Sequence, residues 1–173
     1  LRKNFQAILV GKNTVLKDNP HLSTREKTGN PLRIVLCSDG VLPGKLNIFS
    51  KEAKTLIVCT KKASKKNIHK IISKGAGVLL VKEKNGQIDL ENMLTELGRA
   101  NIASVLVEAG QQTFTSFFKE KLFDELVLII APKIIGKGKM FVQDKIFGEL
   151  QTKKIEKIGS DVWVYFEPKK SIP

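Results

Sequence analysis

Residues that build metal, redox and base-stacking sites are scarce in this chain of 173 residues, which has two cysteines, two histidines, one tryptophan and one tyrosine. Cys37 and Cys59 lie in separate apolar segments without metal-ligand spacing, so we expect buried, reduced thiols. His21 and His69 have no cluster of cysteines or carboxylates at ligand spacing around them. The sequence therefore predicts no metal site.

Long apolar runs are also absent. No stretch approaches the roughly 20 residues that cross a bilayer, and the first five residues lack the apolar core of a secretion signal. We therefore expect no membrane partner and a cytoplasmic location. The chain begins without methionine, in what reads as the middle of a helix, so we expect further residues upstream.

Acidic residues are few beside basic ones, with 17 Asp and Glu against 30 Lys and Arg and a net charge of +13. Such an excess attracts polyanions, so a noncatalytic, basic nucleic-acid-binding domain is one alternative. The lysines, however, are spread in short groups such as Lys61-Lys62 and Lys153-Lys154, and aromatic residues for base stacking are few. We expect no nucleic-acid partner and a field that favours phosphorylated ligands.

Short, β-branched apolar runs predict strands over residues 7–10, 32–37, 55–59, 77–81, 104–107, 125–131 and 162–166. Helical patterns follow Ser64 and Asp89, each placed as an N-cap. Strands with apolar interiors are buried on both faces, which favours a mainly parallel sheet covered by helices. The last two runs have no strong helix between them and indicate antiparallel strands that close the sheet. We predict one α/β domain over residues 1–173 with an open, mixed, mostly parallel sheet.

One candidate site follows the run at 104–107. There a buried strand leads into Glu108, the turn Ala109-Gly110 and a helix whose Phe114, Phe117 and Phe118 form an apolar face. The start of a helix favours phosphate through free N–H groups and the helix dipole. The alternative is an ordinary capped connection with a surface glutamate.

A second candidate site is the polar stretch 11–25, which begins where the first strand ends. Ligands of open α/β sheets bind at the carboxyl ends of strands, so a long polar loop at this place indicates a site. Arg25 offers a planar fork for a phosphate, and Asp18 can accept from ribose or amide groups. The alternative is an exposed connection. No Gly-x-Gly-x-x-Gly fingerprint follows a strand, so we expect no Rossmann-type nucleotide binding.

At these two stretches the chain resembles the C-terminal reductase domain of the bifunctional riboflavin-biosynthesis deaminase/reductase, which has the dihydrofolate-reductase-like fold. The matching segments, which together cover nearly the whole chain, are Ala7-Ile8-Leu9-Val10-Gly11, Thr14-Val15-Leu16-Lys17-Asp18-Asn19-Pro20, Pro31-Leu32-Arg33-Ile34-Val35-Leu36, Val107-Glu108-Ala109-Gly110, Asp124-Glu125-Leu126 and Ile130-Ala131-Pro132-Lys133-Ile134-Ile135-Gly136. The resemblance implies NADPH-dependent reduction of the ribosyl side chain of 5-amino-6-(5-phosphoribosylamino)uracil to the ribityl form. It also implies an opening strand upstream of Leu1, where a zinc deaminase domain can be fused. Another pteridine or pyrimidine reductase of the same fold is the alternative.

The resemblance further implies roles for single residues. Positions that touch NADPH match Thr14, Asp18, Ser38, Gly110, Gln111, Gln112, Thr113, Phe114, Thr115 and Ser116. Positions that bind the phosphorylated aminopyrimidine substrate match Arg2, Leu22, Arg25 and Glu108, with the arginines suited to its phosphate. Glu108 is the one carboxylate placed near the pyrimidine, where we expect it to bind ring N–H groups, with assistance of proton transfer as its alternative role.

The chain departs from the family pattern at two positions. Ala109 stands where the family often has a second glycine, and Cys37 stands where it commonly has an aspartate. The family also implies a homodimer paired through the late strands, here the apolar stretch Leu126-Val127-Leu128-Ile129-Ile130. From the sequence alone, this stretch is equally compatible with a buried central strand.

Overall fold

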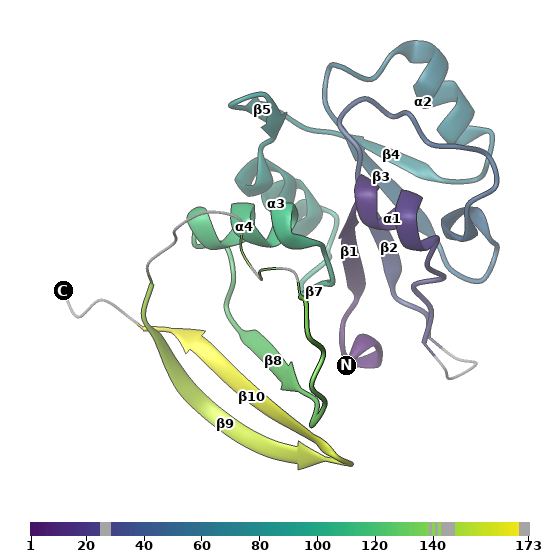
Figure 1. Ribbon diagram of the computed structural model, residues 1–173. Helices are drawn as coiled ribbons and strands as arrows, with labels where there is room; N and C mark the ends of the chain where they lie inside the picture. The colour runs from purple at the N-terminus through teal and green to yellow at the C-terminus, as the bar shows by residue number, and fades with distance from the viewer. Residues whose placement is uncertain (25–28, 139, 141, 143–147, 170–173) are drawn as a thin grey trace. The chain divides into compact units, whose positions relative to one another are not determined.

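The computed structural model describes residues 1–24, 29–138, 140, 142 and 148–169. The chain forms two compact units, Leu1–Thr113 and Phe114–Pro173 (Figure 1). The single domain expected over residues 1–173 stays a prediction. Within the described part, no helix has both the length and the apolar character to span a bilayer.

The first unit is built on a sheet of five parallel strands in the order β4-β3-β2-β1-β7. The strands are β1 (Ala7–Gly11), β2 (Leu32–Leu36), β3 (Thr55–Cys59), β4 (Gly77–Leu80) and β7 (Val105–Val107). Residues 7–10 of β1 are fully buried, as expected for a strand with a neighbour on each side and apolar residues on both faces. The prediction of an α/β fold with a mainly parallel sheet is confirmed.

Helices connect these strands. They are α1 (Lys12–Asp18), α2 (Lys65–Ile72) and α3 (Leu90–Arg99), with two short 3₁₀ turns, η1 (Arg2–Asn4) and η2 (Asn47–Phe49), and a hairpin of β5 (Glu83–Lys84) and β6 (Gln87–Ile88). The N-cap predictions are confirmed: the Ser64 side chain accepts from the Asn67 N–H, and the Asp89 side chain accepts from the Asn92 N–H. The helix α4 (Gln111–Lys119) follows β7.

The expectation of a polar loop throughout residues 11–25 is wrong in its first part, which forms the helix α1. This helix has two turns, and Val15 is its only buried residue, so no apolar periodicity indicated it. It ends at Asn19, whose left-handed backbone (φ 40°) places its N–H on the Val15 carbonyl.

Both cysteines are buried free thiols, as the sequence predicts. Burial raises the pKa of the Cys37 thiol to about 12, with a further contribution from its hydrogen bond to Asp39. Burial also raises the pKa of the Cys59 thiol to about 11. Because the thiolate is the reactive form, burial and the raised pKa values favour a structural role for both cysteines.

The second unit contains an antiparallel sheet in the order β8-β10-β9. Its strands are β8 (Leu126–Ile130), β9 (Leu150–Ile158) and β10 (Asp161–Pro168). The late antiparallel strands are thus confirmed, but in the described residues they pair with one another in a sheet of their own instead of closing the parallel one. The strand β9 was not predicted, because polar side chains, four of them lysine or glutamate, fill six of its nine positions.

Candidate functional site

The direction in which strands are added to the parallel sheet reverses beside β1. From β1 the chain adds β2, β3 and β4 in turn on one side, and it then returns to place β7 on the other side. Ligands of open α/β sheets bind beyond the carboxyl ends of the strands at such a reversal. The segments that follow these two strands are α1 and the turn Glu108-Ala109-Gly110, so both stretches singled out in the sequence meet at the same point.

The two segments approach each other closely. A Cβ atom added to Gly11 would lie 3.0 Å from the Thr113 Oγ1, and one added to Gly110 would lie 3.5 Å from the Thr14 Oγ1. The structure therefore brings together Thr14, Gly110 and Thr113, three of the residues expected at the cofactor. Gly11 lies beside them, although no role was predicted for it. Its position at the end of a buried strand is the sequence feature that could have indicated one.

The other expected cofactor residues lie near the ends of these elements. Gln111, Gln112, Phe114, Thr115 and Ser116 belong to the first two turns of α4, and Thr115 is buried. The first turn of a helix presents backbone N–H groups and the positive end of the helix dipole, which suits phosphate oxygens. The small glycine turn, the hydroxyl groups and the helix start thus fit the phosphates of a dinucleotide.

Asp18 and Ser38 follow β1 and β2 at the same sheet edge. Asp18 is exposed at the last position of α1. The carbonyl of Ser38 accepts from the Thr60 N–H at 3.1 Å and from the Thr60 Oγ1 at 3.3 Å, which ties the end of β2 to the end of β3. Whether a nucleotide contacts them stays a prediction.

An ion pair that sequence reasoning missed also lies at this edge. The Lys12 Nζ donates to both Asp39 carboxylate oxygens at 3.0 and 2.9 Å. The Asp39 Oδ1 also accepts from the Val41 N–H at 3.0 Å and from the Cys37 thiol at 3.3 Å. Burial raises the pKa of the Asp39 carboxyl, but these hydrogen bonds outweigh it, and the pKa lies below its ordinary value. The pair fixes the turn after β2 against the start of α1.

Arg2 and Glu108, both expected at the substrate, form a bidentate ion pair. The Arg2 Nε donates to the Glu108 Oε1 at 2.9 Å, and the Arg2 Nη2 donates to the Glu108 Oε2 at 2.7 Å. The Arg2 Nη1 donates to the Ser23 carbonyl at 2.9 Å. The hydrogen bond with Glu108 raises the pKa of the Arg2 guanidinium above its usual value. One side chain thus connects η1, the end of β7 and the loop between α1 and β2.

The remaining expected substrate residues lie in that loop. Leu22 is 2% exposed and packs in the core, with its backbone in the left-handed region at φ 52°. Its side chain is therefore structural in this conformation. Arg25 lies outside the described residues.

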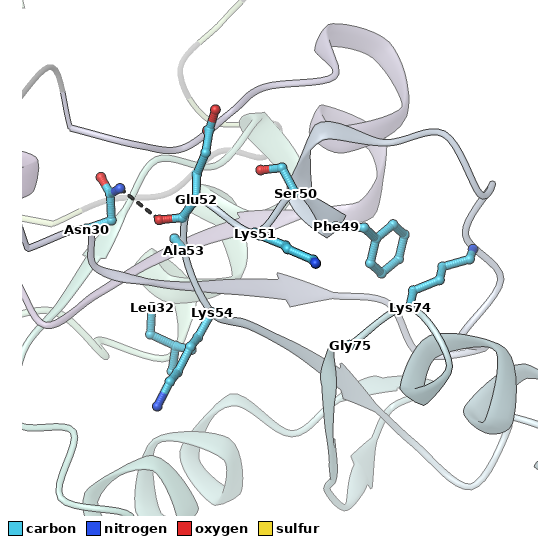
Figure 2. A pocket seen from close by; sticks show the side chains of 10 residues that line it. All are labelled: Asn30, Leu32, Phe49, Ser50, Lys51, Glu52, Ala53, Lys54, Lys74 and Gly75. Atoms are coloured by element: carbon cyan, nitrogen blue, oxygen red, sulfur yellow. Dashed lines mark hydrogen bonds between the residues drawn. The ribbon is translucent and has the colours of Figure 1, made fainter. Parts of the chain in front are cut away.

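A hollow of about 620 Å³ lies at the opposite edge of the sheet, where Leu32, Lys54 and Gly75 stand at the amino ends of three strands. None of the expected site residues that the structure describes lines it. Figure 2 shows that the amino groups of Lys51, Lys54 and Lys74 point in different directions, and that of Lys74 lies 4.6 Å from the centre of the Phe49 ring. The lysines do not converge on one anion position, so this hollow is not the candidate site.

The family model of the RibD C-terminal domain matches residues 1–164. The chain belongs to the RibD C-terminal domain family. The matched range includes β1, β7 and the segments that follow them.

Individual relatives agree with membership of the RibD C-terminal domain family. The riboflavin biosynthesis protein RibD of Aquifex aeolicus is 37% identical over 96% of this chain and 48% of its own length. The 5-amino-6-(5-phosphoribosylamino)uracil reductase of Buchnera aphidicola is 28% identical over 98% of this chain and 89% of its own length. A crystal structure of the deaminase/reductase of Thermotoga maritima superposes with a TM-score of 0.76 at 30% identity, over 97% of this chain and 46% of that chain. The chain spans about half the length of the first of these relatives.

Proposed function

We propose that this chain reduces the ribosyl side chain of 5-amino-6-(5-phosphoribosylamino)uracil to the ribityl form with NADPH. The observation that carries the proposal is the meeting of two sets of residues beside β1: the turn and hydroxyl groups suited to a dinucleotide, and the Arg2–Glu108 pair suited to a polar ring. Membership of the RibD C-terminal domain family supports it.

When bound, NADPH would supply the hydride for the reduction of the sugar's first carbon. In the proposal, Thr14, Gly110 and Thr113 hold its phosphates together with the first turn of α4, while Asp18 and Ser38 contact its other parts. The net charge of +13 favours a cofactor that carries an extra phosphate. We therefore propose NADPH rather than NADH as the partner of this site.

The protein's own residues orient the substrate. A carboxylate accepts hydrogen bonds from ring N–H groups, so Glu108 is suited to the pyrimidine. A guanidinium binds phosphate through two parallel hydrogen bonds, so Arg25 is suited to the substrate phosphate. The reaction requires that the two ligands are held against each other. Fixed orientation of the reactants lowers the activation barrier of such reactions substantially.

The test is a turnover assay on the intact protein. Mixed with the phosphorylated aminopyrimidine, the protein is expected to consume NADPH faster than NADH, and mass spectrometry is expected to find a product heavier by two hydrogen atoms. Gly110→Val should raise the Kd of NADPH by roughly tenfold or more, because its branched side chain fills the space beside the Thr14 hydroxyl.

The matched control is Gly44→Val, whose added Cβ would meet only the flexible end of Lys74, at 3.8 Å. We expect this variant to keep the wild-type affinity for NADPH. Absence of NADPH oxidation by the wild-type protein with this substrate would contradict the proposal. Oxidation with a dihydropteridine alone would favour another reductase of the same fold.

A further inference from the structure

The contacts of Arg2 engage all three nitrogens of its guanidinium. A guanidinium has five N–H donors on three nitrogens. Here each nitrogen donates once: the Nε and Nη2 to the two Glu108 carboxylate oxygens, and the Nη1 to the Ser23 carbonyl. The edge of the guanidinium best shaped for a bidentate anion is therefore already occupied by a carboxylate of this chain.

The same contacts fix the direction of the Glu108 carboxylate. A bidentate pair restricts the rotation of both side chains, because both hydrogen bonds are kept only in one relative orientation. The backbone of Glu108 is held as well, since its N–H donates to the Leu9 carbonyl at 2.9 Å. About a third of each side chain is exposed, 36% for Arg2 and 31% for Glu108, so the carboxylate is fixed and yet accessible to a ligand.

Arg2 also acts on the loop between α1 and β2. Its bond to the Ser23 carbonyl holds the residue next to Leu22, whose backbone has positive φ and whose side chain is in the core. On the other side of this loop, the Thr24 N–H donates to the Asn30 Oδ1 at 2.8 Å. The segment that precedes Arg25 is thus tied to the end of β7 through one guanidinium.

We propose that Arg2 is a positioning residue, which orients the Glu108 carboxylate and the Ser23 segment toward the pyrimidine end of the substrate and does not bind the substrate phosphate. The inference rests on the proposed function, and in it Arg2 acts through Glu108.

The test compares substrates with and without the 5′-phosphate in the intact protein. Arg2→Ala is expected to lower kcat/KM by a similar factor, roughly tenfold or more, for both substrates, because the lost contact concerns the ring end. Arg25→Ala is the matched variant, and its loss is expected with the phosphorylated substrate only. Arg2→Lys keeps the positive charge without the planar fork, so it should not restore the wild-type value.

A double-mutant cycle with Glu108→Gln adds a measurement that a folding defect does not imitate. If Arg2 acts through Glu108, then Arg2→Ala costs little further activity in the Glu108→Gln background. Additive losses, or an Arg2→Ala loss confined to the phosphorylated substrate while the wild-type protein is active, would overturn the positioning role alone. A wild-type protein that reduces neither substrate would overturn the proposed function and the positioning role with it.

Discussion

At the scale of single residues, Arg33 departs most from what the sequence indicates. It lies within a run of apolar residues in β2, and it is fully buried. Its Nη1 faces the carbonyls of Asn47, Ile48, Ser50 and Ala53 at 3.0 to 3.4 Å, and its Nη2 donates to the Ser50 Oγ at 3.0 Å. Burial lowers the pKa of this guanidinium. The side chain therefore holds the segment from η2 to β3 in place through hydrogen bonds with its backbone carbonyls.

Arg33→Met should therefore destabilise the protein strongly. The variant keeps an apolar stem but leaves buried carbonyls without donors, and we expect a loss on the order of 3 kcal/mol in the free energy of unfolding. Urea denaturation of the intact protein measures it. Arg99→Met is the control, since the exposed pair of Arg99 with Glu96 on α3 contributes under about 1 kcal/mol. Equal effects of the two substitutions would contradict the structural role of Arg33.

The ion pairs of the site could not be predicted from the sequence. Arg2 and Glu108 each matched a substrate position, yet their ion pair joins residues 106 positions apart. The pair of Lys12 with Asp39 likewise depends on the register of β1 with β2. Motifs indicate which residues belong to a site, whereas the contacts among them follow from how distant strands are placed side by side.

At the scale of elements, the patterns that predicted structure correctly were those set by burial and capping. The five parallel strands have apolar interiors, and α2 and α3 begin at side chains that accept from the backbone. The helix α1 and the strand β9 were missed for the opposite reason. Each is mostly polar, so its structure depends on the neighbouring elements instead of its own periodicity.

Two glycines in open surroundings should respond oppositely to substitution by alanine. Gly98 lies in α3 with nothing within 4 Å of an added Cβ, so Gly98→Ala should stabilise the protein by about 0.5–1 kcal/mol. Gly86 is as open, but its φ of 78° in the β5–β6 turn is left-handed, so Gly86→Ala should destabilise by roughly 1–2 kcal/mol. Thermal unfolding of the two variants beside the wild type checks both signs, and a stabilising Gly86→Ala would contradict the described turn.

At the scale of the whole molecule, the second unit has many exposed apolar side chains. Leu128, Ile129 and Ile130 of β8 are 39%, 46% and 49% exposed, and Ile155 of β9 is 64% exposed. Both strands are edges of the described antiparallel sheet. Apolar edge strands favour association with another chain, and a two-fold interface would cover them.

We therefore predict a homodimer that buries β8. Light scattering of the intact protein at micromolar concentration should give the dimer mass, and Ile129→Lys should shift it toward the monomer. Ile72→Lys is the control, because Ile72 is a similarly exposed isoleucine, at 54%, on α2 of the first unit. The charge of +13 is screened within about 10 Å at 0.1 M salt, so it does not prevent contact. A wild-type protein of monomer mass at this concentration would exclude the dimer.

From the reversal of strand order beside β1 we expect the site to form late during folding. β1 to β4 are neighbours in the chain as well as in the sheet, so their pairing closes short loops. β7 pairs with β1 only after the chain has passed through β2, β3 and β4. Pairing two strands so far apart in the sequence costs more chain entropy than pairing near neighbours. The free edge of β1 is thus exposed until this last pairing. A ligand bound across β1 and β7 would stabilise that pairing by mass action, so the proposed cofactor would favour the folded chain as well as take part in the reaction.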